Sequence, residues 1–161
     1  MAWTTPKTDW STGELVSAAD LNTMNENLAA LRHPSTAVAA YTTTEDIVVD
    51  TDRELFEDID STNLNLTLVT AGGDVMVHFH GVFTRGSDRD TDNCLDILLD
   101  GNRQGGEDGL MRFGVYGRRR AQSFTHLFQN LGAGSHTFKL QWRNWKLVRL
   151  YAGAQFWVRE I

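Results

Sequence analysis

The spacing of apolar residues changes near Pro34, and this change constrains the fold of the 161-residue chain more than any other feature. Before Pro34, apolar side chains recur every three or four residues, which is the period of an α-helix. From Tyr41 onward, apolar and polar side chains alternate, which is the period of a half-buried β-strand. The sequence therefore predicts an N-terminal helical segment in residues 1–35 and a separate β-rich body in residues 36–161.

The helix is expected to span about residues 17–32. Its first residues, Ser17 to Asp20, have the form of a capping box, in which two side chains satisfy free amide groups of the first turn. Pro34 disfavours helical geometry at the preceding residue and so ends the segment. The apolar positions of the helix, spaced three, four and three residues apart, are Leu21, Met24, Leu28 and Leu31.

This apolar stripe is narrow, as in a coiled-coil seam, and an isolated helix of this length is marginal in water. The sequence contains no second helical pattern, so the stripe must pack on the chain's own body, on a partner protein or on copies of itself. We favour the last two, because tryptophans upstream of the helix extend the apolar surface. The candidate oligomerisation or attachment residues are Trp3, Trp10, Leu21, Met24, Leu28 and Leu31.

The β-rich body contains repeated short strands separated by turn signals. Leu64, Leu66 and Leu68 alternate with polar side chains, and Asp100-Gly101 is a strong hairpin signal. No helical pattern lies between these strands, which favours antiparallel pairing. The predicted fold is mainly β: an antiparallel β-sandwich of jelly-roll type preceded by a short N-terminal α-helix.

Charge is unevenly distributed along the body. Residues 41–100 carry 14 acidic and three basic side chains, whereas residues 101–161 carry three acidic and ten basic ones. One interpretation is a basic face for nucleic acid around Arg118, Arg119 and Arg120. We favour pairing of the two halves, within or between subunits, because a chain of net charge −6 repels polyanions. We expect no nucleic-acid partner.

The sequence offers little for catalysis. It has no G-x-S-x-G, H-E-x-x-H or P-loop motif. The single cysteine, Cys94, opens an apolar run, and a buried cysteine usually serves packing. We therefore expect a non-enzymatic protein without a cofactor.

A first candidate metal cluster lies in an acidic loop. Asp88, Asp90 and Asp92 alternate, and calcium is bound by several oxygen ligands from one loop. However, Asn93 stands where a calcium loop requires Gly, and Leu99 stands where it requires Glu. We expect a solvated acidic loop without a metal.

A second candidate is the pair His78 and His80. Residues two apart on a strand point to the same side, about 6–7 Å from each other. Two ligands from one chain make half a site unless copies converge on an axis, an arrangement that resembles some trimeric phage fibres. We favour two hydrogen-bonded histidines without a metal.

Aromatic residues near the C-terminus suggest an alternative function. Trp142 and Trp145 flank Arg143 and Asn144, a mixture suited to a sugar face or a protein interface. Trp142, Arg143 and Trp145 are therefore candidate ligand or receptor contacts. The competing interpretation places such aromatics in the sandwich core and along its edges.

Two stretches of the sequence resemble known structural proteins. The segment W-S-T-G-E-L-V-S-A-A-D-L-N-T at residues 10–23, followed by N-E-N-L at 25–28, is similar to an N-terminal segment of tailed-phage and prophage structural proteins. Residues 134–142 and 156–160, G-S-H-T-F-K-L-Q-W and F-W-V-R-E, resemble the last strands of trimeric jelly-roll heads, such as tumour-necrosis-factor-like and complement-like domains.

This resemblance implies a phage-like virion appendage of the tail or capsid, homotrimeric, with a head suited to host attachment. The N-terminal segment would dock to other virion proteins. No signal peptide is visible, and every apolar run is far below the roughly 20 residues of a membrane span, so we expect a virion location without membrane insertion. The alternative is a carbohydrate- or receptor-binding module, followed by a small sandwich-fold enzyme.

Overall fold

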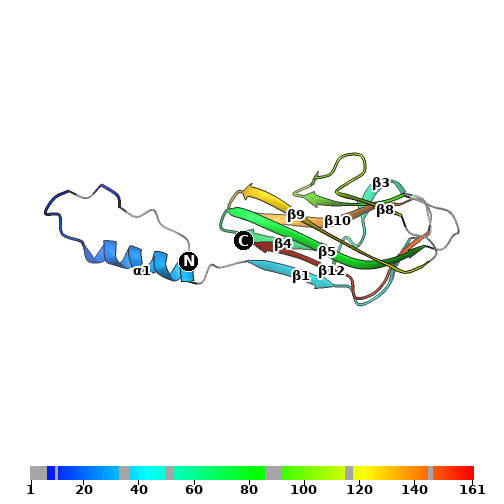
Figure 1. The fold of residues 1–161 in the computed structure, drawn as a ribbon, viewed down its shortest axis with the longest axis horizontal. Helices are drawn as coiled ribbons and strands as arrows, with labels where there is room; N and C mark the ends of the chain where they lie inside the picture. Colours follow the sequence, from blue (N-terminus) through cyan, green and yellow to red (C-terminus); the bar gives the residue numbers. More distant parts are fainter. Residues whose placement is uncertain are drawn as a thin grey trace. The chain divides into compact units, whose positions relative to one another are not determined.

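A computed structural model describes residues 7–9, 11–32, 37–49, 53–85, 92–114, 118–144 and 147–161. The chain divides into two compact units, residues 1–36 and residues 37–161, and each is described by itself (Figure 1). The described part of the first unit contains the helix α1 (Ala18–Arg32), and that of the second consists of strands. The strands are β1 (Val38–Thr42), β2 (Ile47–Val49), β3 (Arg53–Asp58), β4 (Asn65–Thr70), β5 (Gly73–Arg85), β6 (Asp92–Leu99), β7 (Asn102–Arg103), β8 (Met111–Gly114), β9 (Arg120–Leu131), β10 (Gly134–Asn144), β11 (Val148–Leu150) and β12 (Gln155–Glu160).

Helix α1 begins at the capping box that the sequence predicts. The Ser17 amide donates to Asp20 Oδ2 at 3.0 Å, and the Asp20 amide donates to Ser17 Oγ at 3.2 Å. These contacts satisfy amide groups that have no partner within the helix. The predicted helix is confirmed to within one residue at its start. No helix in the described part of the chain is both long and apolar enough to cross a membrane.

The strands form two antiparallel sheets. In the first sheet the order is β1, β12, β5, β9, while β2 and β11 extend the lines of β1 and β12. In the second, β3 and β4 pair with successive parts of β10, which pairs with β6, and β6 pairs with β7 and β8.

The strand order identifies the topology. Two consecutive strands that occupy one position in a sheet are counted as one line: β1 with β2, β3 with β4, β7 with β8, and β11 with β12. The eight lines are numbered in chain order, so β5, β6, β9 and β10 are lines three, four, six and seven. The first sheet then contains lines one, eight, three and six, in that order. The second contains lines two, seven, four and five. Two four-line antiparallel sheets that interleave in this way form a jelly roll. The predicted fold class is confirmed.

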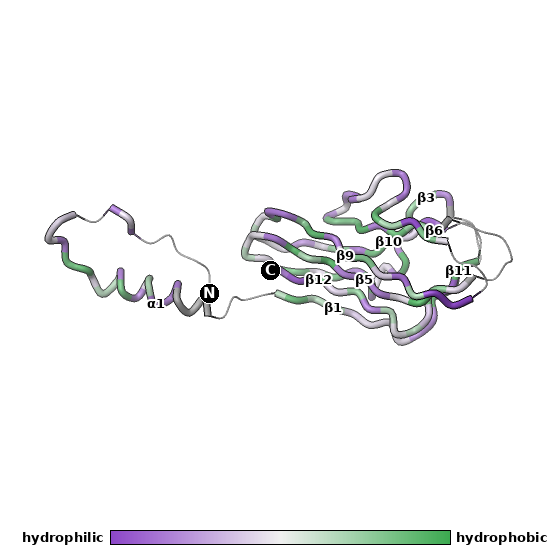
Figure 2. Tube along the Cα trace, in the orientation of Figure 1, coloured by the Kyte–Doolittle hydropathy of each residue, from purple (hydrophilic) through white to green (hydrophobic). Residues whose placement is uncertain are grey.

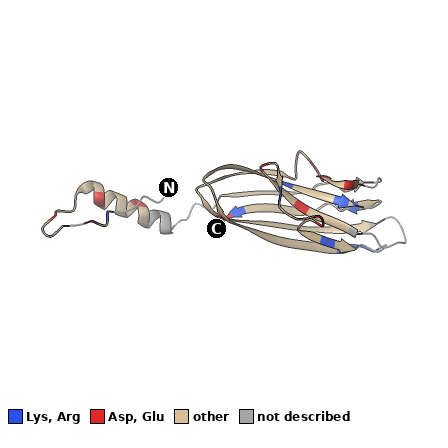
Figure 3. Ribbon diagram, turned by 90° about the horizontal axis from the view of Figure 1, so that it is seen from above, with Lys and Arg blue, Asp and Glu red and all other residues tan. Residues whose placement is uncertain are grey.

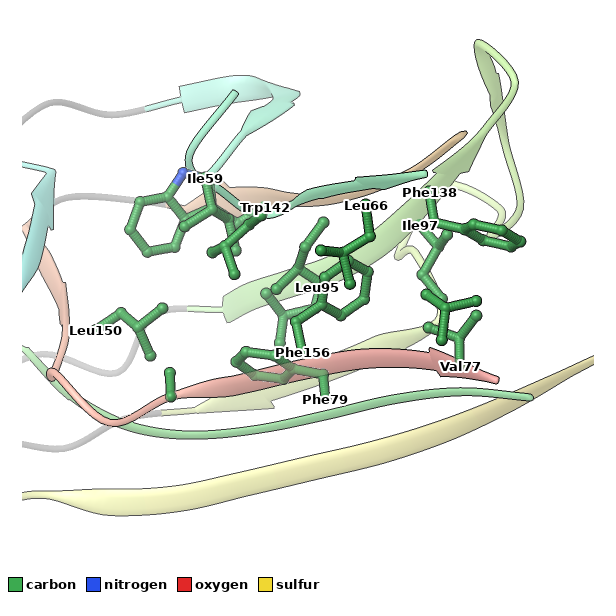
Figure 4. Close-up of a cluster of buried hydrophobic side chains, with 14 of the residues drawn as sticks. Ile59, Leu66, Val77, Phe79, Leu95, Ile97, Phe138, Trp142, Leu150 and Phe156 are labelled. Atoms are coloured by element: carbon green, nitrogen blue, oxygen red, sulfur yellow. The ribbon is translucent and has the colours of Figure 1, made fainter. Parts of the chain in front are cut away.

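The core lies between the two sheets. The first sheet contributes Phe79 of β5 and Phe156 of β12 to this core, and the second sheet contributes Leu95 of β6 and Phe138 of β10. All four side chains are fully buried (Figure 4). Figure 2 shows the hydropathy alternating along the strands that contribute these residues, as burial of one face requires. Gly81 occupies an inward position on β5, where an added Cβ would lie 2.7 Å from Leu150 Cδ1, so a larger residue would force neighbouring core side chains to shift.

Two local features differ from the sequence-based prediction. Strand β3 was not predicted, because its sequence R-E-L-F-E-D has no alternation of apolar residues. Alternation alone also does not separate β11 from β12, which are divided by a turn at residues 151–154, where Gly153 has φ +86°. The predicted hairpin at Asp100-Gly101 is confirmed, since φ values of +48° and +83° match a type I′ turn.

Candidate self-association face

The outer surface of the β1–β12–β5–β9 sheet presents few charges, and we call it the neutral face. On β5 the inward residues Val77 and Phe79 are fully buried, which leaves His78 and His80 pointing outward. The register of the strands places these outward residues in rows across the sheet. The central row is Ala40, Trp157, His78 and Thr125; the rows on either side are Thr42, Gln155, His80 and Ser123, and Val38, Arg159, Met76 and Leu127.

His78 is held in place by both of its neighbours in the central row. Its ring stacks on Trp157, with centroids 5.1 Å apart and planes 27° apart. Its Nδ1 lies 2.9 Å from Thr125 Oγ1, within hydrogen-bonding distance. Burial, and then the neighbouring His80, hold the pKa of His78 below its usual value. The ring is therefore neutral near pH 7, and the centre of the face carries no charge.

Within these three rows Arg159 is the one residue with a permanent charge. Apolar side chains are exposed at the rim, with Val38 58% and Leu127 43% accessible. The flanking positions on β1 and β9 in the two histidine rows are small, being Ala, Thr or Ser. A surface with one permanent charge in three rows, a central aromatic stack and small flanking side chains allows a second protein to approach closely.

The outer surface of the other sheet is different, and we call it the charged face. Figure 3 shows where Lys, Arg, Asp and Glu lie along the chain. Asp96 of β6 is fully buried; its Oδ2 accepts from Arg103 Nε at 2.8 Å, and its Oδ1 accepts from the amides of Ile97 and Gly105. Lys139 Nζ lies 3.2 Å from Asp58 Oδ2. The charges named here are compensated within one subunit.

An aromatic ring on the charged face is covered by guanidinium groups. The Arg103 guanidinium carbon lies 3.7 Å from the centroid of the Phe56 ring, and that of Arg143 lies 5.4 Å from it. Arg143 also pairs with Asp108 at 3.1 Å. Cation–π contact and ion pairing together order this part of the surface.

The predicted pairing of the acidic and basic halves is present within one subunit. Arg103 with Asp96 and Lys139 with Asp58 each join residues from the two halves. The triplet Arg118–Arg120 is exposed, and the Arg119 guanidinium lies 4.2 Å from the centroid of the Tyr151 ring.

The predicted attachment residues belong to the N-terminal unit. Leu21 and Met24 of α1 are 51% and 50% exposed. Trp3 and Trp10 lie outside the described residues. Leu28 and Leu31 lie in α1, but their side chains are outside the described part.

Trp142 requires a correction. It is 2% exposed and packs in the core between the sheets, because it shares its side of β10 with Phe138 and Leu140 (Figure 4). Its ring cannot form an exposed sugar platform. Arg143 points outward and already contacts Asp108, and Trp145 lies outside the described residues.

A small polar pocket lies in the head. It has a volume of about 330 Å³ and is lined by residues that include Tyr41, Glu45, Asp46 and Asp60. Asp46 accepts from the Ala152 amide, and Asp60 accepts from two amides of its own turn. These two carboxylates are used to hold turns, so we do not assign a ligand to this pocket.

The candidate metal ligands are not brought together. Among the described residues, no three His, Cys, Asp or Glu side chains are placed to hold a metal ion. His78 and His80 lie on the neutral face. Asp88 and Asp90 are outside the described residues, and Asp92 begins β6 with its side chain outside the described part.

Sequence analysis identified His78 and His80 but missed the residues that complete their rows. Trp157 and Thr125 lie on strands 79 and 47 positions away in sequence from His78, and only strand register brings them together. One signal in the sequence was alternation along β12: Phe156 points into the core, so the next residue, Trp157, points outward.

Comparison with known proteins gives a fold likeness and little else. No family model matches the chain, and no curated protein matches it. Among solved structures, it is similar to murine APRIL at pH 8.0 (9% identity over 79% of this chain and 100% of that chain, TM-score 0.49). It is also similar to Eiger TNF from S. frugiperda (13% identity over 78% of this chain and 91% of that chain, TM-score 0.46). Such values carry no argument about function, and the jelly-roll assignment rests on the strand order.

Proposed function

We propose that this chain is a non-enzymatic structural protein that assembles into a homotrimer through the neutral face. The observation that carries the proposal is the central row of that face, in which Trp157 and His78 stack between the small residues Ala40 and Thr125. Covering this row removes apolar surface from water, which contributes about 25 cal/mol per Å². The charged face gains less from a partner, because its ion pairs are formed within the subunit.

We further propose that the trimer is an appendage of a phage-like particle, with residues 1–35 docking to other virion proteins and the head available for host attachment. The support is the resemblance of residues 10–28 to N-terminal segments of phage structural proteins, and of the last strands to trimeric jelly-roll heads. The half-exposed Leu21 and Met24 on α1 offer apolar contacts for docking.

The assembly is tested by light scattering coupled to size-exclusion chromatography at tens of micromolar protein. We expect a mass about three times the 18.1 kDa of one chain. Thr125→Glu places a charge in the central row and should give a monomer. Thr67→Glu is the matched control, because Thr67 is an exposed threonine on β4 of the other sheet. A monomeric native protein, or equal effects of the two variants, would contradict the proposal.

The role of the N-terminal segment is tested by deleting residues 1–36, the first compact unit. We expect a soluble, β-rich head that still assembles, because the neutral face lies wholly within residues 37–161. Loss of the folded head would show instead that α1 belongs to its core. Detection of the chain in purified phage particles by mass spectrometry tests the virion role, and a glycan array tests the carbohydrate-binding alternative.

A further inference from the structure

We propose that assembly through the neutral face is acid-sensitive, because protonation of His78 and His80 places uncompensated positive charge at its centre and drives the copies apart. This inference rests on the proposed self-association and concerns its regulation. Each ring occupies the β5 position of its own row, and β5 is paired with a neighbouring strand on both sides.

Both histidines are already partly buried in the single subunit. His78 lies between Trp157 and Thr125, and His80 lies between Gln155 and Ser123 in the next row. A partner that covers the central row covers both rings. Their protonated forms would then lose the water that solvates them, and transfer of a charge out of water is costly unless the charge is paired.

Among the described residues, the two histidine rows contain no carboxylate to pair with these charges. On β12 the charged residue of the face is Arg159, one row from His78 and of the same sign as imidazolium. On β9 and β1 the outward residues of the two histidine rows do not titrate near pH 6; they are Ala40, Thr42, Ser123 and Thr125.

The nearest acidic groups lie elsewhere. On β5, Asp74 is four residues from His78, about 13 Å along the strand, and accepts from the Asn130 amide. Glu160 of β12 is buried on the inner side, where it accepts from the amides of residues 71 and 72. Asp46 lies beside Arg149, which is outward at the far end of the face.

The pKa of His78 in the single subunit is already shifted in the direction that the proposal requires. Burial and the neighbouring His80 lower the pKa of His78 before any partner is present. A ring stacked on Trp157 gains some cation–π attraction when protonated. Burial acts in the opposite direction and lowers the pKa of His78. Closing a partner over the face increases the burial and brings the histidines of several copies together.

The sign of the pH dependence follows from linkage. At pH values above about 6.5, the usual pKa of histidine, the His78 ring is neutral in free and assembled chains, because burial holds its pKa below that value. Below it, free chains bind protons that assembled chains must release. The logarithm of the association constant then falls by one per pH unit for each proton released. For a trimer, one histidine per chain gives a slope approaching three, and two give a slope approaching six.

The experiment is sedimentation equilibrium of the full chain between pH 8.0 and 5.0 at constant ionic strength, with far-UV circular dichroism to verify that the head stays folded. We expect constant association above about pH 6.5 and, below it, a slope that approaches three, about a 1,000-fold weakening per pH unit, if one histidine per chain releases its proton, and a steeper slope approaching six if both do. A flat profile for an oligomer that persists to pH 5.0 would overturn the inference and leave the self-association intact. A monomer at every pH would overturn the proposed function and this inference with it.

Variants assign the effect to the two rings. In His78→Asn/His80→Gln, the Asn amide can keep the contact to Thr125, so we expect assembly at pH 8.0 with a flat profile. His136→Gln is the control, since His136 lies on β10 outside the neutral face, and its slope should equal that of the native chain. A slope that survives in the double variant would overturn the assignment. Should that variant fail to fold, the native slope still decides between acid-sensitive and acid-insensitive assembly.

Discussion

The two outer faces of the jelly roll differ in their polar side chains: one face contains charges that are paired within the subunit, and the other contains few charges. On the charged face, Asp96 and Lys139 find partners within the subunit, at 2.8 Å and 3.2 Å. On the neutral face, the central row holds an aromatic stack, and Arg159 is the one permanent charge in the three rows.

This difference teaches where a partner would gain free energy. A surface whose charges are already paired offers a partner polar groups that must be desolvated again. A surface of small and aromatic side chains offers apolar area at little desolvation cost. The neutral face is therefore the better place for assembly, and the charged face the better place for contact with water. The predictions below test this contrast.

The largest expected effect comes from a pair of tryptophans, one in the core and one on the neutral face. Trp142→Ala should lower the free energy of unfolding by about 3–5 kcal/mol, because it leaves a cavity between the sheets. Trp157→Ala, made in the Thr125→Glu background, should cost less than about 1 kcal/mol. Urea titration followed by circular dichroism measures both. Similar losses in the two variants would show that Trp157 is part of the core.

The buried carboxylate of the charged face gives the next effect. Asp96→Asn keeps one oxygen for the amides of Ile97 and Gly105 but loses the charge-assisted bond to Arg103. We expect a loss of about 2 kcal/mol in urea titration. The mass in solution should not change, because Asp96 lies on the charged face and the proposed interface is on the neutral face. Dissociation of the oligomer would argue against the contrast between the two faces.

A smaller and pH-dependent effect is expected at His136, which lies on neither histidine row. Its Nδ1 is 2.7 Å from Asp100 Oδ2, and its Nε2 is 2.8 Å from the Gly132 carbonyl oxygen. Only the doubly protonated ring can donate to both, and the hydrogen bonds to Asp100 and Gly132 raise the pKa of His136.

A raised pKa contributes stability below the unfolded-state pKa of about 6.5, and this stability is lost as pH rises through the folded-state pKa. We therefore expect His136→Gln to cost about 1 kcal/mol at pH 6 and less at pH 9, as measured by urea titration at each pH. A cost that grows toward pH 9 would refute this. Acid thus strengthens the His136 contact while it weakens the neutral face, so unfolding and dissociation can be told apart.

The smallest effect is expected from an exposed pair on the charged face. Lys139→Gln removes the pair with Asp58, but Asp58 still accepts from Gln141 Nε2 at 2.8 Å. We expect a loss of less than about 1 kcal/mol and an unchanged mass in solution, measured by thermal unfolding and light scattering. A clear change in mass would move the assembly to the charged face.

The elements of the fold were predicted from local sequence patterns. The capping box located the start of α1, and the Asp-Gly pair located the turn after β6. Strand β3 was missed because Leu55 and Phe56 are adjacent and flanked by charges, and only pairing with β10 makes the segment a strand. Periodicity reports the face of a strand but not its neighbours.

The candidate site was harder to predict for the same reason. Outward positions of His78 and His80 followed from alternation, but the stack with Trp157 depends on register between distant strands. Trp142 could have been placed in the core, because it shares parity with Phe138 and Leu140. Its aromatic and polar neighbours in the sequence are typical of a binding surface, but parity decides its position.

The pairing of β1 with β12 gives the head a polarity. Val38 lies opposite Arg159, and the Glu160 amide donates to the Ala37 carbonyl oxygen at 3.0 Å, so the chain enters and leaves the sandwich at one pole. A segment that precedes residue 37 therefore joins the head at this end of the sandwich, and a tag fused after residue 161 would lie at the same end. Strand β5 runs from this pole to Arg85, and β9 returns from Arg120. The opposite end of the sandwich, where β5 ends and β9 begins, is therefore the end farther from both chain ends of the head.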